Sequence, residues 1–188
     1  DSLRPDAAGV INALQEAGLK TWLLSGDRSS APTEMGRQLG MDHVAGGLLP
    51  EDKQEAIRRL QAEGAIVVMV GDGVNDAPGL GQAHLSIAMA SGTDLAQTTA
   101  DALLLRDDLR ALVTARQQAI ATQRIIRQNL TWALAYNLAV LPPAALGFVP
   151  PWLAAIGMSL SSLVVVGNAL RLRKTRILPE PLHSTTTA

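Results

Sequence analysis

The chain of 188 residues contains no cysteine, and it lacks charge over one long stretch. Without cysteine there is no disulfide framework and no thiolate metal site, so a soft metal would need other ligands. The formal net charge is -1, so no basic surplus favours nucleic acid, and no nucleic-acid partner is expected. Between Asn129 and Leu170 there is no Asp, Glu, Lys or Arg, whereas residues 1–128 carry charges throughout. The charged part therefore suits water, and the charge-free part suits an apolar environment.

The charged part alternates helical and strand-like patterns. Apolar residues at helical spacing predict helices over 7–17 and 50–63. Short apolar runs predict strands at 21–25, 65–70, 85–89 and 100–105. Strands that alternate with helices indicate a mainly parallel sheet that is covered on both faces. The predicted fold class is α/β, with a partial Rossmann-like parallel sheet and flanking helices over residues 1–107.

The charge-free part is long enough to cross a lipid bilayer twice. Gly and Pro at 147–151 favour a turn, which leaves predicted transmembrane helices at 129–148 and 152–171. A charged stalk helix over 108–128 precedes this α-helical transmembrane hairpin, and a tail over 172–188 follows it. Basic residues flank the hairpin at both ends, so that side and the soluble part are predicted to be cytoplasmic. The competing interpretation is a buried helical hairpin in a soluble bundle.

Two polar loops follow predicted strands, at the sheet edge where parallel sheets bind ligands. One begins with Ser25 and Gly26, which offer a hydroxyl and backbone donors to a phosphate. The other has the sequence G-D-G-V-N-D, in which the glycines let N–H groups approach an anion. Its Asp72 and Asp76 are hard oxygen ligands suited to Mg²⁺, and Lys53 adds a positive charge from a helix start. The set predicts metal-assisted phosphoryl transfer, although a plain turn would also explain the second loop.

Four strings in the first part resemble the P-type ATPases of the haloacid dehalogenase-like superfamily. They are LLSGD at 23–27, PEDK at 50–53, VGDGVNDAPGL at 70–80 and IAMASGTDLA at 87–96. The resemblance implies Mg²⁺ and ATP as cofactors, with ATP phosphorylating an aspartate whose aspartyl phosphate is then hydrolysed. It further implies that Ser25 and Gly26 contact the phosphate, that Lys53 stabilises it, and that Asp72 and Asp76 bind Mg²⁺ with Gly71 and Asn75 supporting the site. Asp27, Thr93 and Asp94 match too, and we expect structural roles for them.

The family's D-K-T-G-T string is absent, and so are other acidic motifs of that kind. The phosphorylated aspartate is therefore expected outside these residues, and the chain is interpreted as the C-terminal portion of a longer pump. Its partner would be the missing N-terminal part, with the actuator and nucleotide-binding domains and the earlier membrane helices. Alone, the chain would be inactive. The alternatives are a membrane protein that binds or regulates a full-length pump, and a phosphatase-like domain tethered to the membrane.

Polar and soft side chains occur inside the predicted hairpin, where they are costly unless they face protein or a transport path. Tyr136 and Asn137 fall in the first helix, and Met158 and Ser162 fall in the second. A thioether favours Cu(I), whereas helix packing would also explain the polar groups.

The strings QNLTWALAYN and GNALRLRK resemble the last two helices of the copper-transporting heavy-metal branch. This resemblance implies that Tyr136, Asn137, Met158 and Ser162 contribute to binding of transported Cu(I), with Ag(I) not separable from it. A zinc or cadmium pump is the alternative, but such pumps place an acidic residue in the last helix, and none occurs here. The lipid bilayer and a copper chaperone are further expected partners. The expected location is the bacterial inner membrane.

Overall fold

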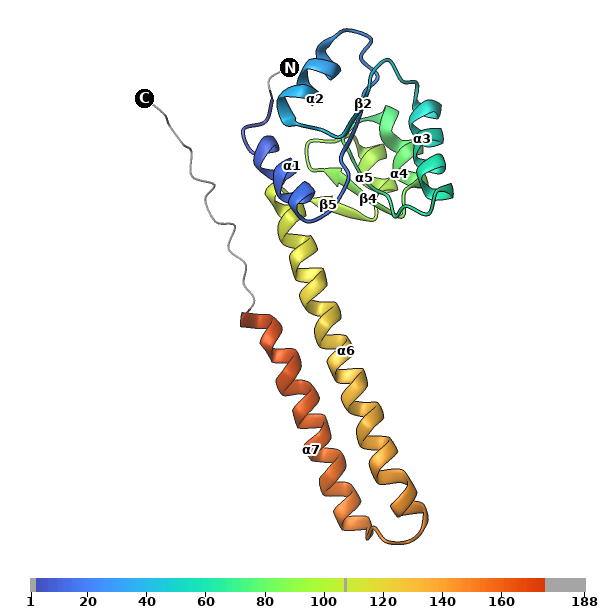
Figure 1. Cartoon of the computed structure of the whole chain (residues 1–188), viewed down its shortest axis with the longest axis vertical. Helices are drawn as coiled ribbons and strands as arrows, with labels where there is room; N and C mark the ends of the chain where they lie inside the picture. The colour runs from blue at the N-terminus through green and yellow to red at the C-terminus, as the bar shows by residue number, and fades with distance from the viewer. Residues whose placement is uncertain (1–2, 107, 175–188) are drawn as a thin grey trace, which may run out of the picture. The chain divides into compact units, whose positions relative to one another are not determined.

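Parallel strands alternate with helices through the first part of the computed structural model, which describes residues 3–106 and 108–174 (Figure 1). The chain divides after Val113 into two units, which are described separately. The elements of the first are α1 (Ala7–Glu16), β1 (Trp22–Leu24), α2 (Ala31–Leu39), β2 (His43–Ala45), α3 (Pro50–Ala62), β3 (Val68–Gly71), η1 (Val74–Asp76), α4 (Ala77–Gln82), β4 (Leu85–Met89), α5 (Asp94–Thr99) and β5 (Ala102–Leu104). This order confirms the predicted α/β class.

The parallel strands form two sheets rather than one. Strand β1 pairs with β2, with Leu23 opposite Val44. Strands β3, β4 and β5 form a second sheet in that order, with Val70 opposite Ile87. Within the part of the chain that the structure describes, β1 and β3 each pair on one side only. The alternation of elements was predictable, but the division of the sheet was not.

Local signals in the sequence explain where helix α3 begins and ends. Pro50 occupies its first turn, where a missing N–H costs nothing. The backbone N–H of Leu49 donates to the Asp52 carboxylate at 2.9 Å, so this donor just before the helix has a hydrogen-bond partner. Gly64 then takes a φ of 86°, a left-handed conformation that ends the helix at low steric cost. These signals place Lys53 in the first turn of α3.

The core of the first unit is small and lies between the second sheet and the helices α4 and α5. Leu80, Ala88 and Ala96 are buried together, and Met69 packs against them. Gly79 makes this packing possible, because a Cβ there would lie 2.6 Å from the Met69 sulfur. A glycine at this position therefore fits the core, whatever it costs in helix propensity.

Two aspartates of the first unit accept hydrogen bonds from backbone N–H and hydroxyl groups. The Asp42 carboxylate accepts hydrogen bonds from the Thr21 N–H at 2.7 Å and the Thr21 hydroxyl at 2.8 Å. These bonds lower the pKa of Asp42, with the backbone bond as the larger cause. Asp101 accepts in the same way from the hydroxyl and N–H of the buried Ser86, which lowers its pKa. Asp101 thus connects β4 to the residue before β5, and Asp42 connects the residues that immediately precede β1 and β2.

The second unit is a pair of helices. Helix α6 (Arg110–Ala145) begins before the division and continues without a break through most of the predicted stalk and first span. Pro142 and Pro143 lie in its final turns, and Gly147 takes a φ of 80° in the turn that follows. Helix α7 (Pro151–Leu170) then leads into η2 (Arg171–Lys174). The break between the helices falls where Gly and Pro cluster.

A seam of half-buried residues joins α6 to α7. On α6 the seam residues are Ile125, Asn129, Ala133, Tyr136 and Val140, and on α7 they are Ala154, Gly157, Ser161, Val165 and Asn168. The spacing of three and four residues is that of helices packed side by side. Asn168 donates to Asn129 at 2.9 Å, and the Trp132 indole donates to Ser161 at 3.1 Å. Later residues of α6 therefore pair with earlier residues of α7, so the two helices are antiparallel.

Among the described residues, Pro151–Arg173 is long and apolar enough to cross a membrane by length and composition. Most of the predicted span at 129–148 lies in α6, which ends at Ala145, three residues before the predicted end. This helix is not among those that reach that level of apolarity, because Asn129, Asn137 and the two prolines interrupt its apolar residues. The transmembrane character of the hairpin stays a prediction. The predicted tail at 172–188 lies mostly outside the described residues.

Candidate functional site: a phosphate and magnesium loop

An ion pair between Lys53 and Asp76 is the centre of the candidate site. The Lys53 ammonium lies 2.7 Å from one oxygen of Asp76, and the exposed fractions of the two side chains are 9% and 16%. Lys53 comes from the first turn of α3, and Asp76 ends η1, just after β3. Two motifs that are 23 residues apart in the sequence therefore meet in direct contact.

The other oxygen of Asp76 organises the loop that follows β3. It accepts hydrogen bonds from the backbone N–H groups of Asp72 and Gly73, both at 3.3 Å. Gly71 makes room for this arrangement, because a Cβ there would lie 2.8 Å from the Asp76 Cβ. Both carboxylate oxygens of Asp76 thus have partners within the chain. In this structure Asp76 therefore fixes the loop and the Lys53 ammonium through these bonds.

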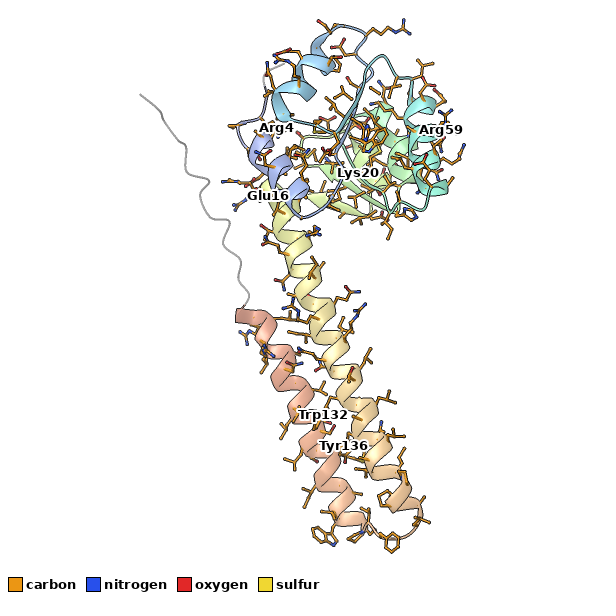
Figure 2. The ribbon with its side chains drawn as sticks, viewed as in Figure 1. Arg4, Glu16, Lys20, Arg59, Trp132 and Tyr136 are labelled. Atoms are coloured by element: carbon orange, nitrogen blue, oxygen red, sulfur yellow. The ribbon has the colours of Figure 1, made fainter. Side chains whose placement is uncertain are left out.

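Asp72 has a different environment from Asp76. It is exposed, and no hydrogen bond or ion pair engages its carboxylate within the described residues. It borders a pocket of about 230 Å³ that Gly71, Asp76 and Met89 also line. Arg4, labelled in Figure 2, contributes a positive charge to the same pocket. An available carboxylate beside a glycine turn has the donor chemistry that Mg²⁺ requires, so the residues fit that ion.

The turn before α5 supports the same loop from the other side. The Thr93 N–H donates to the Asp72 carbonyl at 2.9 Å, and the Thr93 hydroxyl accepts from the Ala96 N–H as an N-cap. Gly92 allows this approach, since a Cβ there would lie 2.9 Å from the Asp72 carbonyl oxygen. The importance of Gly92 was missed from the sequence, although its position between β4 and a capping threonine was the available signal.

Ser25 and Gly26 lie on the other sheet, at the end of β1. The Ser25 hydroxyl accepts from the Asp27 N–H at 3.1 Å, and the Ser25 carbonyl accepts from Leu48 at 3.0 Å. A hydrogen bond from the Ser29 N–H lowers the pKa of Asp27. Within the described part of the chain no hydrogen bond joins this loop to Asp72 or Asp76. The side chain of Asn75 is exposed and forms no hydrogen bond with the residues described.

The four predicted cargo residues differ in how far they are buried. Tyr136 lies in the seam, one turn of α6 from Trp132 (Figure 2), and its hydroxyl lies where a Cβ on Gly157 would be only 2.5 Å away. Asn137, Met158 and Ser162 are exposed beside the seam. The described residues contain no group of three or more His, Cys, Asp or Glu that could hold a metal.

Comparison with known proteins agrees with the geometry of the first unit. A family model described as haloacid dehalogenase-like hydrolase matches residues 1–84. The chain is 46% identical over 173 residues to cation-transporting P-type ATPase B of Mycobacterium bovis, covering 92% of this chain and 23% of that protein. It is 44% identical over 179 residues to a copper-exporting P-type ATPase of Staphylococcus aureus, covering 95% and 22%. The chain belongs to the P-type ATPases.

Solved structures of the P-type ATPases place it in the heavy-metal branch. A crystal structure of a zinc-transporting PIB-type ATPase matches with a TM-score of 0.85 and 44% identity, covering 92% of this chain and 28% of that one. A structure of the catalytic domain of the CPx-ATPase CopB-B matches with a TM-score of 0.56 and 37% identity, covering 60% of this chain and 45% of that one. The chain spans less than a quarter of the length of the curated relatives named above. The predicted family and its haloacid dehalogenase-like fold are confirmed.

Proposed function

We propose that the chain is the C-terminal portion of an ATP-driven exporter of Cu(I) or Ag(I) that forms an aspartyl phosphate. The observation that carries the proposal is the contact between Lys53 and Asp76 at 2.7 Å, which joins two family motifs beneath the Asp72 loop. A lysine, an available carboxylate and glycine-rich backbone together form a phosphate-handling set. The chain would supply the magnesium and phosphate contacts of a longer pump.

The residues of the first unit divide the work of phosphoryl transfer. Asp76 holds the ammonium of Lys53 in place, so that its positive charge is fixed near the loop before a phosphate arrives. Asp72 would hold Mg²⁺, which when bound supplies positive charge to the transferring phosphoryl group. Ser25 and Gly26 would bind phosphate oxygens through a hydroxyl and a backbone N–H. Gly71 keeps Asp76 close enough to hold the loop.

The open edges of the two sheets favour a phosphorylated aspartate that lies outside this chain. Val68 and Val70 lie on one face of β3 and are exposed at 52% and 37%, although parallel sheets are normally buried on both faces. Both β1 and β3 also have an open edge within the described residues. A further strand that paired with these edges would carry the phosphorylated aspartate to a position between Ser25 and Asp72. The isolated chain would then neither hydrolyse ATP nor become phosphorylated.

The geometry of α6 and α7 supports a shared side for the cargo residues. Asn137, Met158 and Ser162 each follow a seam residue by one position. In an antiparallel pair of helices, positions that follow the seam fall on the same side of the pair. A thioether and an amide would therefore face one path, with the Tyr136 hydroxyl at its border. The soft thioether favours Cu(I) over zinc, and the second helix lacks an acidic residue for a divalent ion.

A chimera tests this function in a complete pump. The chain would replace the matching segment of the Staphylococcus aureus copper-exporting P-type ATPase, and ATP hydrolysis would be measured with and without Cu(I) and Zn²⁺. We expect Cu(I) to stimulate hydrolysis, and Lys53→Met or Asp72→Asn to reduce it by about 100-fold or more. Lys20→Met is the matched control, because Lys20 is an exposed lysine of the same unit (Figure 2). Stimulation by Zn²⁺ alone would contradict the proposed cargo, and full activity of Lys53→Met would contradict the proposed site.

A further inference from the structure

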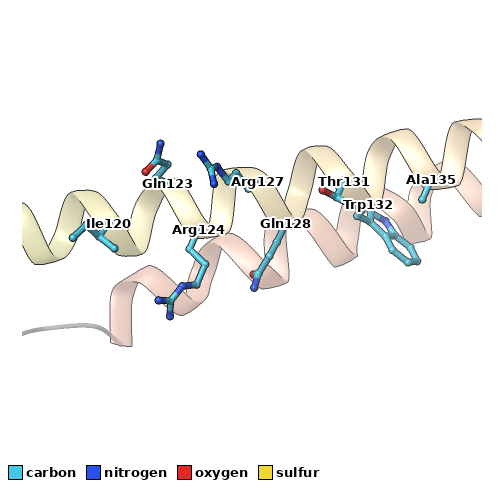
Figure 3. Close-up of a pocket in the computed structure, with 8 residues that line it drawn as sticks. All are labelled: Ile120, Gln123, Arg124, Arg127, Gln128, Thr131, Trp132 and Ala135. Atoms are coloured by element: carbon cyan, nitrogen blue, oxygen red, sulfur yellow. The ribbon is translucent and has the colours of Figure 1, made fainter. Parts of the chain in front are cut away.

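A groove runs along one face of α6, near the start of the charge-free stretch. Its volume is about 630 Å³, and Figure 3 shows the side chains that line it. They include Arg124, Arg127, Gln128, Thr131 and Trp132, with Ile120 at one end. The groove therefore combines two cationic side chains with hydrogen-bond donors and an aromatic ring. Nothing in the proposed transport or phosphoryl chemistry uses it.

The groove lies on the opposite side of the helix pair from the cargo residues. Arg124, Gln128 and Trp132 each precede a seam residue by one position, whereas Asn137, Met158 and Ser162 each follow one. In antiparallel helices these two sets face opposite sides of the pair. The groove is therefore separate from the proposed cargo path.

The charges around the groove have one sign. From Leu109 to Pro179 the sequence contains no Asp or Glu, while arginines occur at both ends of the hairpin. Neither Arg124 nor Arg127 forms an ion pair among the described residues. Asn168 connects the helices here, since it donates to Gln128 at 3.2 Å and accepts from Arg171 at 3.1 Å. The groove therefore carries positive charge that no described carboxylate balances, and an anionic ligand would be electrostatically complementary to it.

We propose that this groove binds the headgroup of an anionic glycerophospholipid. Arg124 and Arg127 bind the phosphate, Gln128 and Thr131 donate hydrogen bonds to the headgroup, and Trp132 sits at the level of the glycerol backbone. Trp and Arg are the residues that favour this depth of a bilayer. Trp132 is held in position by its bond to Ser161. The inference requires that the hairpin enters a membrane, but it does not depend on the transported metal.

Tryptophan fluorescence tests the proposal in the full chain, which has three tryptophans. Replacing Trp22 and Trp152 by Phe leaves Trp132 as the reporter in the groove, and replacing Trp22 and Trp132 leaves Trp152 beyond the turn. Each protein is reconstituted in phosphatidylcholine nanodiscs that contain increasing amounts of brominated phosphatidylglycerol or brominated phosphatidylcholine. Quenching of Trp152 by brominated phosphatidylcholine reports membrane entry independently of any lipid preference.

We expect phosphatidylglycerol to be preferred over phosphatidylcholine at Trp132 by at least about fivefold, and no preference at Trp152. Arg124→Gln with Arg127→Gln brings the preference at Trp132 close to one. Arg124→Lys with Arg127→Lys retains most of it, which shows that charge and not misfolding is responsible, and Arg28→Gln leaves it unchanged. Equal quenching by the two lipids at Trp132, or a preference that survives the double Gln substitution, would overturn the proposal.

Discussion

The phosphate loop and the helix pair differ in how completely this chain positions their functional groups. In the loop, Asp76 is held on both oxygens, and its partners are a lysine and two backbone N–H groups. In the helix pair, the seam is well connected, yet Asn137, Met158 and Ser162 remain exposed beside it. A preformed site tolerates little change, whereas an open face tolerates more. The proposed function gives this difference a chemical reason, because phosphoryl transfer would need fixed charges before substrate arrives.

The largest expected effect comes from breaking the ion pair of the loop. Lys53→Met leaves a mostly buried Asp76 carboxylate without its cation, which costs about 3 kcal/mol in the unfolding free energy of the first unit. Urea unfolding followed by Trp22 fluorescence measures it. Lys20→Met, at an exposed lysine, should change the same free energy by less than about 0.5 kcal/mol. Equal effects of the two substitutions would mean that the loop is not preformed.

A second substitution tests the space beneath Asp76. Gly71→Ala places a Cβ 2.8 Å from the Asp76 Cβ, so either the loop or the aspartate must move, at about 1–3 kcal/mol. Gly81→Ala is the matched control, because a Cβ there meets only the Thr99 methyl at 3.8 Å and lies in α4. This control should stabilise the unit by up to about 1 kcal/mol. The same urea assay would reject the account if Gly71→Ala were neutral.

The helix pair offers a parallel test with a smaller effect. A Cβ at Gly157 would lie 2.5 Å from the Tyr136 hydroxyl, while a Cβ at Gly167 meets nothing within 4 Å. Gly157→Ala should therefore push the helices apart and lower thermal stability in lipid nanodiscs by about 1 kcal/mol relative to Gly167→Ala. Circular dichroism on heating measures the difference. If both substitutions raised stability equally, the seam contact between Tyr136 and Gly157 would not exist.

The smallest expected effect is on the stability of the first unit at acidic pH. Hydrogen bonds lower the pKa of Asp42 and Asp101 below their usual value of 3.8 in the folded chain. Their stabilising contribution is therefore complete above pH 3.8 and is lost as the pH falls further through the folded pKa values. Asp101→Asn should flatten that part of the stability profile, measured by thermal unfolding between pH 2 and 5. An unchanged profile would remove Asp101 from the account.

Much of the first unit could be predicted from the sequence because its signals are local. Pro50, Gly64 and the apolar runs mark element boundaries, and the motifs identified Lys53 and Asp76 before their contact was seen. The division of the sheet was not predictable, since strand periodicity does not state which strand pairs with which. The role of Asp76 as a holder of Lys53 and of the loop N–H groups also depended on geometry.

The second unit was less predictable in detail. The charged stalk, the charge-free stretch and the Gly–Pro turn predicted a stalk helix and two spans, but they did not indicate that stalk and first span form one helix, α6. In the first unit, too, the Met69 contact that explains Gly79 joins residues that no periodicity connects. The two sides of the helix pair follow from the antiparallel seam, which becomes visible only when Gly157 and Ser161 are seen against α6. Long-range contacts therefore account for what the sequence could not indicate.

The most direct test of the central claim is the location of phosphate after incubation with ATP labelled at its γ-phosphate. The isolated chain should acquire no acid-stable label, whereas the chimera should be labelled on the part that the Staphylococcus aureus pump contributes. In the chimera, Lys53→Met should lower the amount of phosphoenzyme by at least about 10-fold, while Lys20→Met should not change it. Acid-stable label on a residue of this chain itself would contradict the claim that its phosphorylated aspartate lies elsewhere.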